Sequence, residues 1–306
     1  MPRMTSALIL AAGFGTRLRP LTLELPKPVV PVGDRPLLAH VAAACRRAGI
    51  ERLIANAHHE HEKLSSVIKR LSLDIEVVVE ARIRGTAGGV AGARGLFDSA
   101  AVLVWNGDIL TEAPVRELLE LAGARDAQVL AVSPRPRGEG TVGLDEAGGV
   151  VRLRGQVFGT EVAGGDYVGV MALGPGVVAG LPALGDLVGD VALPELARGG
   201  KVWTLPSTAP WSDLGDLSEY VDANFRWLDA RFGPAALARS WVDESAVVAR
   251  GVQLERSLIG RGVQLSGTGT VTEVIAWPGA AFSAPLARAV VLGSGRVVPF
   301  ENPAEN

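Results

Sequence analysis

The residues best suited to chemistry near the start of the chain are two cations beside a glycine turn. The turn Gly13–Thr16 follows the apolar run Ala7–Leu10, and Arg17 and Lys27 come after it. Glycines let the backbone turn sharply, so that its N–H groups can form an anion-binding nest. Arginine and lysine add the positive charge that a triphosphate needs. The segment predicts a polyphosphate-binding loop; the alternative is an ordinary buried strand and turn, with both cations merely solvated.

The spacing of this turn does not match two common nucleotide-binding loops. The third glycine of the dinucleotide motif GxGxxG is missing, and no Gly-Lys-Ser or Gly-Lys-Thr of a Walker loop follows.

Two aspartates that stand far apart in the sequence are candidates for binding a metal ion. Asp108 closely follows the apolar run Val102–Trp105, and Asp213 lies within Trp211–Gly215. Mg²⁺ prefers carboxylate and phosphate oxygens and keeps several waters, so two aspartates suit a metal bound to a triphosphate. A single aspartate in a turn is more often structural.

The first hundred residues alternate between strand and helix patterns. Short apolar runs indicate strands, and apolar residues at helical spacing after Pro36 and over Glu62–Leu71 indicate helices. The expected strands are Ala7–Leu10, Arg52–Ala55, Ile75–Val79 and Val102–Trp105. This alternation predicts an α/β fold with an open, mostly parallel sheet, in which ligands bind beyond the carboxyl ends of the strands. The glycine turn and Asp108 both fall at that edge.

A long motif identifies the family. The segment LILAAGFGTRLRPLT, followed by PKPVVPVGDRPLL, resembles the signature of the sugar-1-phosphate nucleotidyltransferases, also called NDP-sugar pyrophosphorylases. The chain resembles in particular the mannose-1-phosphate guanylyltransferases and the MurNAc-1-phosphate uridylyltransferases. The resemblance implies a Rossmann-like, glycosyltransferase-A-like fold with a mixed, mostly parallel sheet. It also implies the reaction of an NTP with a sugar 1-phosphate to give an NDP-sugar and pyrophosphate.

The resemblance assigns residues to each part of that reaction. Arg17, Lys27 and Asp108 would be catalytic: Arg17 stabilises the leaving pyrophosphate and Lys27 bridges phosphates. Asp108 and Asp213 would hold the cofactor Mg²⁺. Further positions would contact the nucleotide or the sugar: Leu10, Ala12, Gly13, Gly15, Thr16, Glu80 and Gly85 for the nucleotide, and Gly140 and Gly169 for the sugar, with Asp166 and Tyr167 as nearby polar candidates. Asp216 and Leu217 depart from the family's threonine and proline.

The base is suggested by Glu80, whose carboxylate can accept hydrogen bonds but cannot donate them. Guanine presents two adjacent donors on its Watson–Crick edge, which favours GTP with mannose 1-phosphate. UTP with an amino-sugar 1-phosphate comes next, because uridylyltransferase-like relatives also carry a glutamate near a TAGG segment. In the structural alternative, Glu80 ends a strand and pairs with Arg82 or Arg84.

The sugar side departs from the family, which usually has a lysine in a Glu-Lys-Pro segment. This chain has Leu153-Arg154-Gly155-Gln156-Val157 there. Arg152 and Arg154 lie two apart on an expected strand, so they should share one face of it. Either arginine is a candidate for the phosphate of the sugar 1-phosphate, and solvation of both is the alternative.

The composition changes from Trp241 onward, where apolar residues recur at intervals of six in two series: Val242, Val248 and Leu254, then Ile259, Leu265 and Val271. This hexapeptide period predicts a short parallel β-helix, which we expect to be left-handed. The expected domains are therefore a nucleotidyltransferase domain at 1–238 and a β-helix at 239–306, through which the chain could form a homo-oligomer.

Composition and charge narrow the remaining possibilities. The net charge of −3 gives no support for a nucleic-acid or acidic-membrane partner. The single cysteine, Cys45, is expected in the core and fits a cytoplasmic location. His58, His59 and His61 lack the pattern of a metal site and are expected in a solvated loop or helix start. The competing function is a catalytically inactive, NDP-sugar-binding regulatory subunit.

Overall fold

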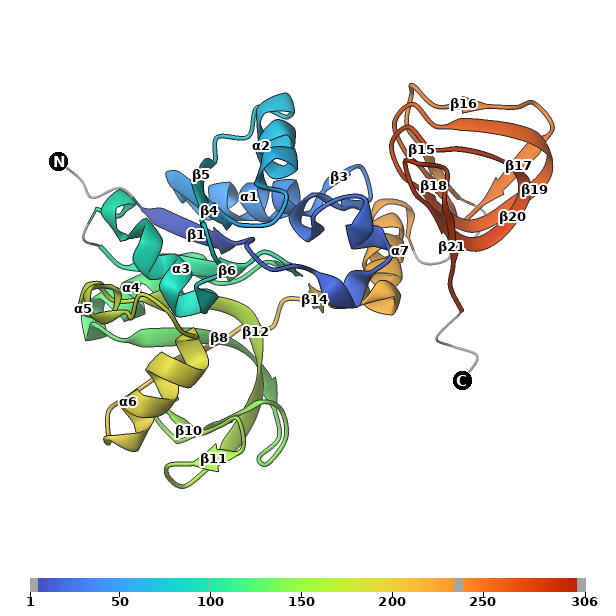
Figure 1. The fold of residues 1–306 in the computed structure, drawn as a ribbon. Helices are drawn as coiled ribbons and strands as arrows, with labels where there is room; N and C mark the ends of the chain where they lie inside the picture. The colour runs from blue at the N-terminus through green and yellow to red at the C-terminus, as the bar shows by residue number, and fades with distance from the viewer. Residues whose placement is uncertain (1–4, 99, 234–238, 302–306) are drawn as a thin grey trace. The chain divides into compact units, whose positions relative to one another are not determined.

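The chain forms two compact units (Figure 1), and the computed structural model describes residues 5–98, 100–233 and 239–301. The first unit contains Leu38–Asp213 and the N-terminal segment up to Gly13. The second contains Phe14–Leu37 and the chain from Leu214 onward. The sequence predicts a domain boundary after residue 238, and residues 234–238 lie outside the part of the chain that the structure describes. The contacts group residues 14–37 and 214–233 with the C-terminal strands.

The first unit is built on one mixed ten-stranded sheet. Its parallel part has the order β6–β1–β4–β5, in which Leu10 at the end of β1 lies between Asn56 and Asn106 at the ends of its neighbours. These strands are β1 (Ser6–Leu10), β4 (Arg52–Ala57), β5 (Glu76–Val79) and β6 (Val102–Asn106). The strands expected from the apolar runs are confirmed, and β1 is buried because its residues are apolar on both faces.

The other part of the sheet is mainly antiparallel and is organised around β12. β12 pairs antiparallel with β6, β8 and β9, and β10 pairs antiparallel with β9 and β11, while β13 is parallel to β8. The strands are β8 (Gln128–Arg135), β9 (Val142–Leu144), β10 (Val150–Leu153), β11 (Gln156–Val157), β12 (Ala163–Leu173) and β13 (Trp203–Pro206). The expectation of a mostly parallel sheet is wrong here, because short turns join β9, β10 and β11 and only antiparallel strands can be joined so.

Helices pack on the sheet of the first unit (Figure 1). They are α1 (Leu37–Arg47), α2 (His61–Arg70), α3 (Gly85–Ala93), α4 (Val115–Arg125), α5 (Pro175–Gly180), the π-helix η5 (Leu187–Ala192) and α6 (Leu193–Ala197); η4 (Arg94–Leu96) is a single turn. Cys45 is fully buried on α1, and burial raises the pKa of its thiol to about 12, so it belongs to the core as expected. His61 begins α2, and the ring Nδ1 of His58 lies 2.8 Å from the Glu80 carbonyl oxygen.

A small two-stranded sheet joins two distant parts of the first unit. β7 (Ile109–Thr111) pairs antiparallel with β14 (Trp211–Asp213), and Ile109 lies opposite Asp213. Trp105, which is fully buried, donates its indole N–H to the Ile109 carbonyl oxygen at 3.0 Å and so fixes the turn between β6 and β7.

The second unit combines two segments that are far apart in the sequence. It contains the short helices η1 (Thr16–Leu18), η2 (Leu21–Leu23) and η3 (Lys27–Val29), the strand pair β2 (Pro31–Val32) and β3 (Arg35–Pro36), and the long helix α7 (Leu217–Phe232). Asp216 caps α7 by accepting the Glu219 N–H at 3.0 Å, which explains an aspartate at that position. The hydroxyl of Tyr220 donates to the Pro31 carbonyl oxygen at 2.7 Å and accepts the indole N–H of Trp277 at 2.9 Å.

The C-terminal strands repeat along the chain. Trp241 pairs with Leu258, Val247 with Gln264 and Val252 with Gly269, so these three parallel pairs join residues 17 positions apart. The strands are β15 (Trp241–Val242), β16 (Val247–Val248), β17 (Val252–Glu255), β18 (Leu258–Ile259), β19 (Gln264–Ala276), β20 (Ala281–Val291) and β21 (Val297–Pro299).

The apolar side chains of these strands form their own core, and among them Ile259, Leu265 and Val271 are buried, whereas Val242 is largely exposed. A strand-rich C-terminal region is therefore present.

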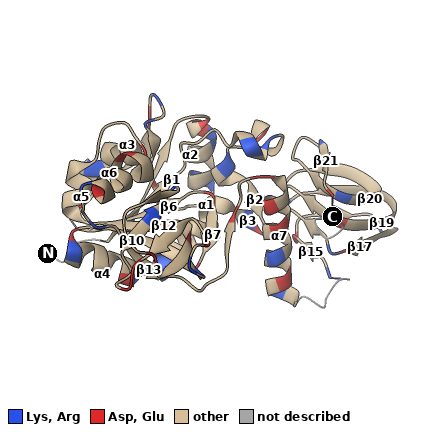
Figure 2. Cartoon of the chain, turned by 90° about the horizontal axis from the view of Figure 1, so that it is seen from below, with Lys and Arg blue, Asp and Glu red and all other residues tan. Residues whose placement is uncertain are grey.

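Two further features bear on partners. Among the described residues, no helix is both long and apolar enough to cross a bilayer. Acidic and basic residues are interspersed along the described elements (Figure 2), in keeping with the small net charge.

Candidate active site

The start of the glycine turn is held by a buried polar chain of hydrogen bonds. The Ala11 N–H donates to Asn56 Oδ1 at 2.8 Å, and Asn56 Nδ2 donates to Glu80 Oε1 at 2.8 Å. The other carboxylate oxygen of Glu80 accepts the Arg84 N–H at 3.1 Å, one residue before α3 begins. Asn56 and Glu80 are both 3% exposed. This chain fixes the end of β1 relative to the N-terminus of α3.

Glu80 thus has both carboxylate oxygens bonded to the protein. Its partners are the amide side chain of Asn56 and the backbone N–H of Arg84, in place of the arginine side chain that the structural alternative predicts. Gly85 follows with a φ of 76°, and a Cβ there would lie 2.3 Å from the Gly185 carbonyl oxygen, so glycine is required.

The remaining nucleotide-loop residues are divided between the two units. Leu10, Ala12 and Gly13 belong to the first unit, whereas Gly15 and Thr16 belong to the second with Arg17 and Lys27. Gly15 has a φ of 61°, and its carbonyl oxygen accepts the Thr22 hydroxyl at 2.8 Å.

Arg17 is exposed on η1, and its guanidinium lies against Gly215, where an added Cβ would be 3.0 Å from Nη1. This second unit therefore presents an arginine on a short helix that follows a left-handed glycine.

Asp108 and Asp213 come together through the β7–β14 pair. Asp213 lies opposite Ile109, and Asp108 is the residue before Ile109. Opposite Cα atoms in an antiparallel pair are about 4.5–5.5 Å apart, so Asp213 lies that close to Ile109, the residue next to Asp108. Gly107, just before Asp108, is buried, and its N–H donates to the Leu10 carbonyl oxygen at 2.9 Å. The turn thus places Asp108 beside the end of β1.

These two carboxylates fit Mg²⁺ only in part. Among the described residues, no group of three or more His, Cys, Asp or Glu side chains could hold a metal ion. Mg²⁺ is commonly bound through one or two carboxylates together with waters and substrate phosphates. The donor set therefore fits a Mg²⁺ ion that arrives with a polyphosphate.

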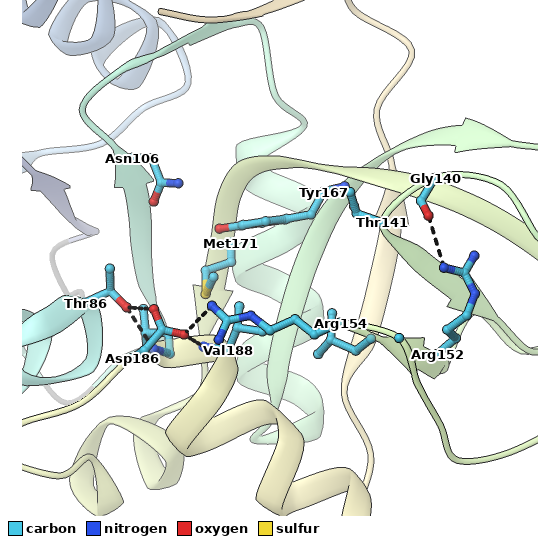
Figure 3. A pocket seen from close by; sticks show the side chains of 13 residues that line it. Thr86, Asn106, Gly140, Thr141, Arg152, Arg154, Tyr167, Met171, Asp186 and Val188 are labelled. Atoms are coloured by element: carbon cyan, nitrogen blue, oxygen red, sulfur yellow. Dashed lines mark hydrogen bonds and ion pairs between the residues drawn. The ribbon is translucent and has the colours of Figure 1, made fainter. Parts of the chain in front are cut away.

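A cavity of about 510 Å³ opens within the first unit (Figure 3). Its walls come from the end of β6, the first turn of α3, the turn after β10, the strand β12 and the start of η5. The lining includes apolar side chains, among them Leu153, Met171 and Val188, together with several polar groups. An apolar wall with a few polar groups is typical of a pocket for a small molecule.

Two arginines line this cavity but differ in their contacts. Arg152 bonds Glu161 and the carbonyl oxygens of Glu139 and Gly140, whereas Arg154 donates through Nη2 to Asp186 Oδ1 at 2.9 Å. The expectation that they share a strand face is wrong, because β10 ends at Leu153 and Arg154 has a φ of 48° in the turn that follows.

The three other residues predicted to contact the sugar differ in their position relative to the cavity. Gly140 lines the cavity, with a φ of 71° and its backbone against Gly165. Asp166 accepts Arg135 Nε at 2.6 Å and the Thr141 N–H at 3.2 Å, and Gly169 is buried against Ile109. Asp166 and Gly169 are not among the residues that line this cavity.

Sequence reasoning missed three polar residues of this region. Asn56 ends β4 beside Leu10, and a polar residue at the end of an apolar strand could have signalled it. Thr86 donates its hydroxyl to Asp186 Oδ2 at 3.1 Å. The two residues are 100 positions apart in the sequence, so no local sequence pattern predicts this contact. Asp186 itself caps η5, which has no strong sequence signal.

Known proteins that are similar to this chain are nucleotidyltransferases. Residues 6–154 match the family model described as Nucleotidyl transferase, so the chain carries a domain of that family. A similar curated protein is the probable mannose-1-phosphate guanylyltransferase 2 of Arabidopsis thaliana. It is 29% identical over 268 residues, which are 80% of this chain and 73% of that protein. The mannose-1-phosphate guanylyltransferase of Mycobacterium tuberculosis is 31% identical over 226 residues, covering 70% of this chain and 62% of that protein.

Solved structures agree on the fold. HddC from Yersinia pseudotuberculosis superposes with a TM-score of 0.62 at 20% identity, covering 73% of this chain and all of that chain. An apo UDP-glucose pyrophosphorylase gives a TM-score of 0.61 at 15% identity and covers 74% of this chain. The Rossmann-like fold with a mixed sheet is thereby confirmed.

Proposed function

We propose that this protein transfers a nucleotidyl group from an NTP to a sugar 1-phosphate, giving an NDP-sugar and pyrophosphate. The observation that carries the proposal is the β7–β14 pair, which brings Asp108 and Asp213 together beside the end of β1. A phosphate-binding sequence follows β1 directly, and the first unit holds a cavity large enough for a sugar phosphate.

The mechanism requires positioning and charge stabilisation rather than a covalent enzyme intermediate. The sugar-phosphate oxygen attacks the α-phosphorus in line, and pyrophosphate leaves. Backbone N–H groups of the turn Gly13–Thr16 orient the triphosphate, and Arg17 and Lys27 stabilise its negative charge. Asp108 and Asp213 would hold Mg²⁺, which neutralises charge on the phosphates when it is bound.

We favour GTP and mannose 1-phosphate as substrates. The support is that several relatives are named mannose-1-phosphate guanylyltransferases, across plants, yeast and a bacterium. The buried bonds of Glu80 make it a positioning residue, because they order the segment between β5 and α3, where the base would bind. UTP with an amino-sugar 1-phosphate remains the second substrate pair.

The decisive experiment measures pyrophosphate release by the purified protein with Mg²⁺. Each of GTP, UTP, ATP, CTP and dTTP is combined with mannose 1-phosphate, glucose 1-phosphate and amino-sugar 1-phosphates. We expect the highest kcat/KM with GTP and mannose 1-phosphate. Highest turnover with UTP and an amino sugar would replace that pair. NDP-sugar binding without turnover on any pair would favour the inactive regulatory subunit.

We also propose that the C-terminal strands form a left-handed β-helix that supports a homo-oligomer in the cytoplasm. The support is the regular 17-residue spacing of the parallel pairs. Size-exclusion chromatography with light scattering would give the oligomeric state of the full chain and of a chain shortened at residue 238.

A further inference from the structure

The two arginines of the cavity differ in how much hydrogen-bonding capacity the protein already uses. Arg152 donates through Nε and Nη2 to Glu161, through Nη2 to the Glu139 carbonyl and through Nη1 to the Gly140 carbonyl at 3.0 Å. Its side chain is only 18% exposed. These bonds tie β10 to the loop before β9, so Arg152 is a structural residue of the cavity wall.

Arg154 is held more loosely and faces the cavity. Its guanidinium makes a single bond among the described residues, from Nη2 to Asp186 Oδ1, and the side chain is 55% exposed. Figure 3 shows it reaching along the cavity wall to Asp186, while Arg152 lies apart with Gly140. Since a guanidinium has five N–H donors, most of those of Arg154 remain for a ligand.

Asp186 can give up Arg154 without losing its own partners. Its Oδ1 also accepts the N–H groups of Val188 at 2.9 Å and Gly189 at 2.7 Å, and its Oδ2 accepts the Thr86 hydroxyl. Burial opposes ionisation of the Asp186 carboxyl, but the Gly189 N–H, the charge of Arg154, the Thr86 hydroxyl and the Val188 N–H together hold its pKa below the usual value. An exposed ion pair stabilises a fold little, so Arg154 can turn from Asp186 to an anion at small cost.

Tyr167 supplies a second polar group. In Figure 3 its ring crosses the cavity above Met171. Its hydroxyl oxygen is buried and has no hydrogen-bond partner among the described residues. Burial, and then the negative charges of Asp186 and Asp108, raise the pKa of this hydroxyl, so it stays protonated and can donate. A buried hydroxyl without a protein partner lowers stability, which is expected where a ligand supplies the partner.

We infer that Arg154, positioned by Asp186, binds the phosphate of the sugar 1-phosphate, and that Tyr167 donates a hydrogen bond to an oxygen of the same substrate. This inference rests on the proposed function and deepens it, because it names the residues that replace the family's missing lysine. Arg154 is available to the phosphate and Arg152 is not. The apolar side chains Leu153, Met171 and Val188 face the carbon atoms of the sugar ring.

The test for Arg154 compares three alanine variants with the parent on the best substrate pair. R154A is expected to raise the KM for the sugar 1-phosphate by roughly ten- to a hundredfold, because a bond to a charged group is lost. The KM for the NTP and the Tm should not change. R47A is the matched control: Arg47 is as exposed on α1, in an ion pair with Glu112, and its loss should leave all constants unchanged. R152A should lower the Tm.

The test for Tyr167 separates function from stability. Y167F removes only a hydroxyl that has no protein partner, so the Tm should stay the same or rise, while kcat/KM for the sugar 1-phosphate falls about fivefold or more. A parent-like kcat/KM in Y167F would remove Tyr167 from the site, and a parent-like KM in R154A would overturn the anchor. If the parent protein turns over no substrate pair, the proposed function itself fails. If the parent protein is active and R154A has the same KM for the sugar 1-phosphate, only the role of Arg154 fails.

Discussion

At the scale of single residues, the candidate site depends on carboxylates in different surroundings. Asp108 and Asp213 begin from adjacent positions of a two-stranded sheet, where a metal–polyphosphate complex could reach both. Glu80 is buried with both oxygens bonded, and Asp186 caps η5 while it holds an arginine. The same side-chain chemistry would therefore serve the proposed metal binding in one place, and it serves backbone positioning in the other two.

The first prediction concerns Asp108. We expect D108N to keep the fold but lose most turnover, on the order of 100-fold or more in kcat, because an amide cannot replace the charge that holds Mg²⁺ near the phosphates. Pyrophosphate release over a Mg²⁺ titration measures this, with the Tm as the control for folding. Near-normal activity at saturating Mg²⁺ would show that Asp108 is not a metal ligand.

Glu161 gives a prediction for the dependence of stability on pH. The guanidinium of Arg152 and the Gly138 N–H lower the pKa of its carboxyl to about 2. A group whose pKa is lower in the folded state adds stability above its unfolded pKa of about 4.3, and this stability disappears as pH falls towards 2. E161Q should therefore have a lower Tm than the parent at pH 7, and the difference should shrink between about pH 4.5 and pH 2. A constant difference over that range would contradict the assignment of the Arg152–Glu161 pair.

At the scale of elements, the sequence was informative wherever a local pattern decided the structure. The apolar runs of β1, β4, β5 and β6 were found because a strand buried on both faces consists of consecutive apolar residues. The antiparallel region around β12 was not foreseen, since the pairing of β12 with β6 and β8 depends on contacts distant in the sequence. The long motif after β1 suggested the family, but the contact between Thr86 and Asp186 joins residues 100 positions apart, so no local pattern indicated it.

A prediction at this scale concerns the junction of β5 and α3. E80Q places an amide where both oxygens of Glu80 accept hydrogen bonds, so the new NH₂ group must face a donor, either Asn56 Nδ2 or the Arg84 N–H. We expect a loss of about 1–3 kcal/mol in the free energy of unfolding and a weaker preference among nucleotides. Urea denaturation and the nucleotide panel measure the two effects. An unchanged stability together with an unchanged preference would show that Glu80 neither orders this segment nor acts on the base.

At the scale of the whole molecule, the second unit combines a segment from near the N-terminus with the chain from Leu214 onward. Gly13 ends the first unit's N-terminal segment, and Gly15, Arg17 and Lys27 lie in the second unit with α7 and the C-terminal strands. Within that unit the loop region is tied to the C-terminal strands, since Glu24 accepts the Ser294 hydroxyl at 2.7 Å and the Ser294 N–H at 3.0 Å. The C-terminal strands therefore contribute to ordering the segment that carries both cations.

Tyr220 provides the sharpest test of this link. Its buried hydroxyl donates to the Pro31 carbonyl, beyond Lys27, and accepts the Trp277 N–H from the C-terminal strands. Y220F leaves both groups without this partner, so the free energy of unfolding should fall by about 1–3 kcal/mol. Y167F is the matched control, because it removes a tyrosine hydroxyl that has no protein partner. Equal stability of Y220F and Y167F in chemical denaturation would show that the Pro31–Tyr220–Trp277 chain does not stabilise the second unit.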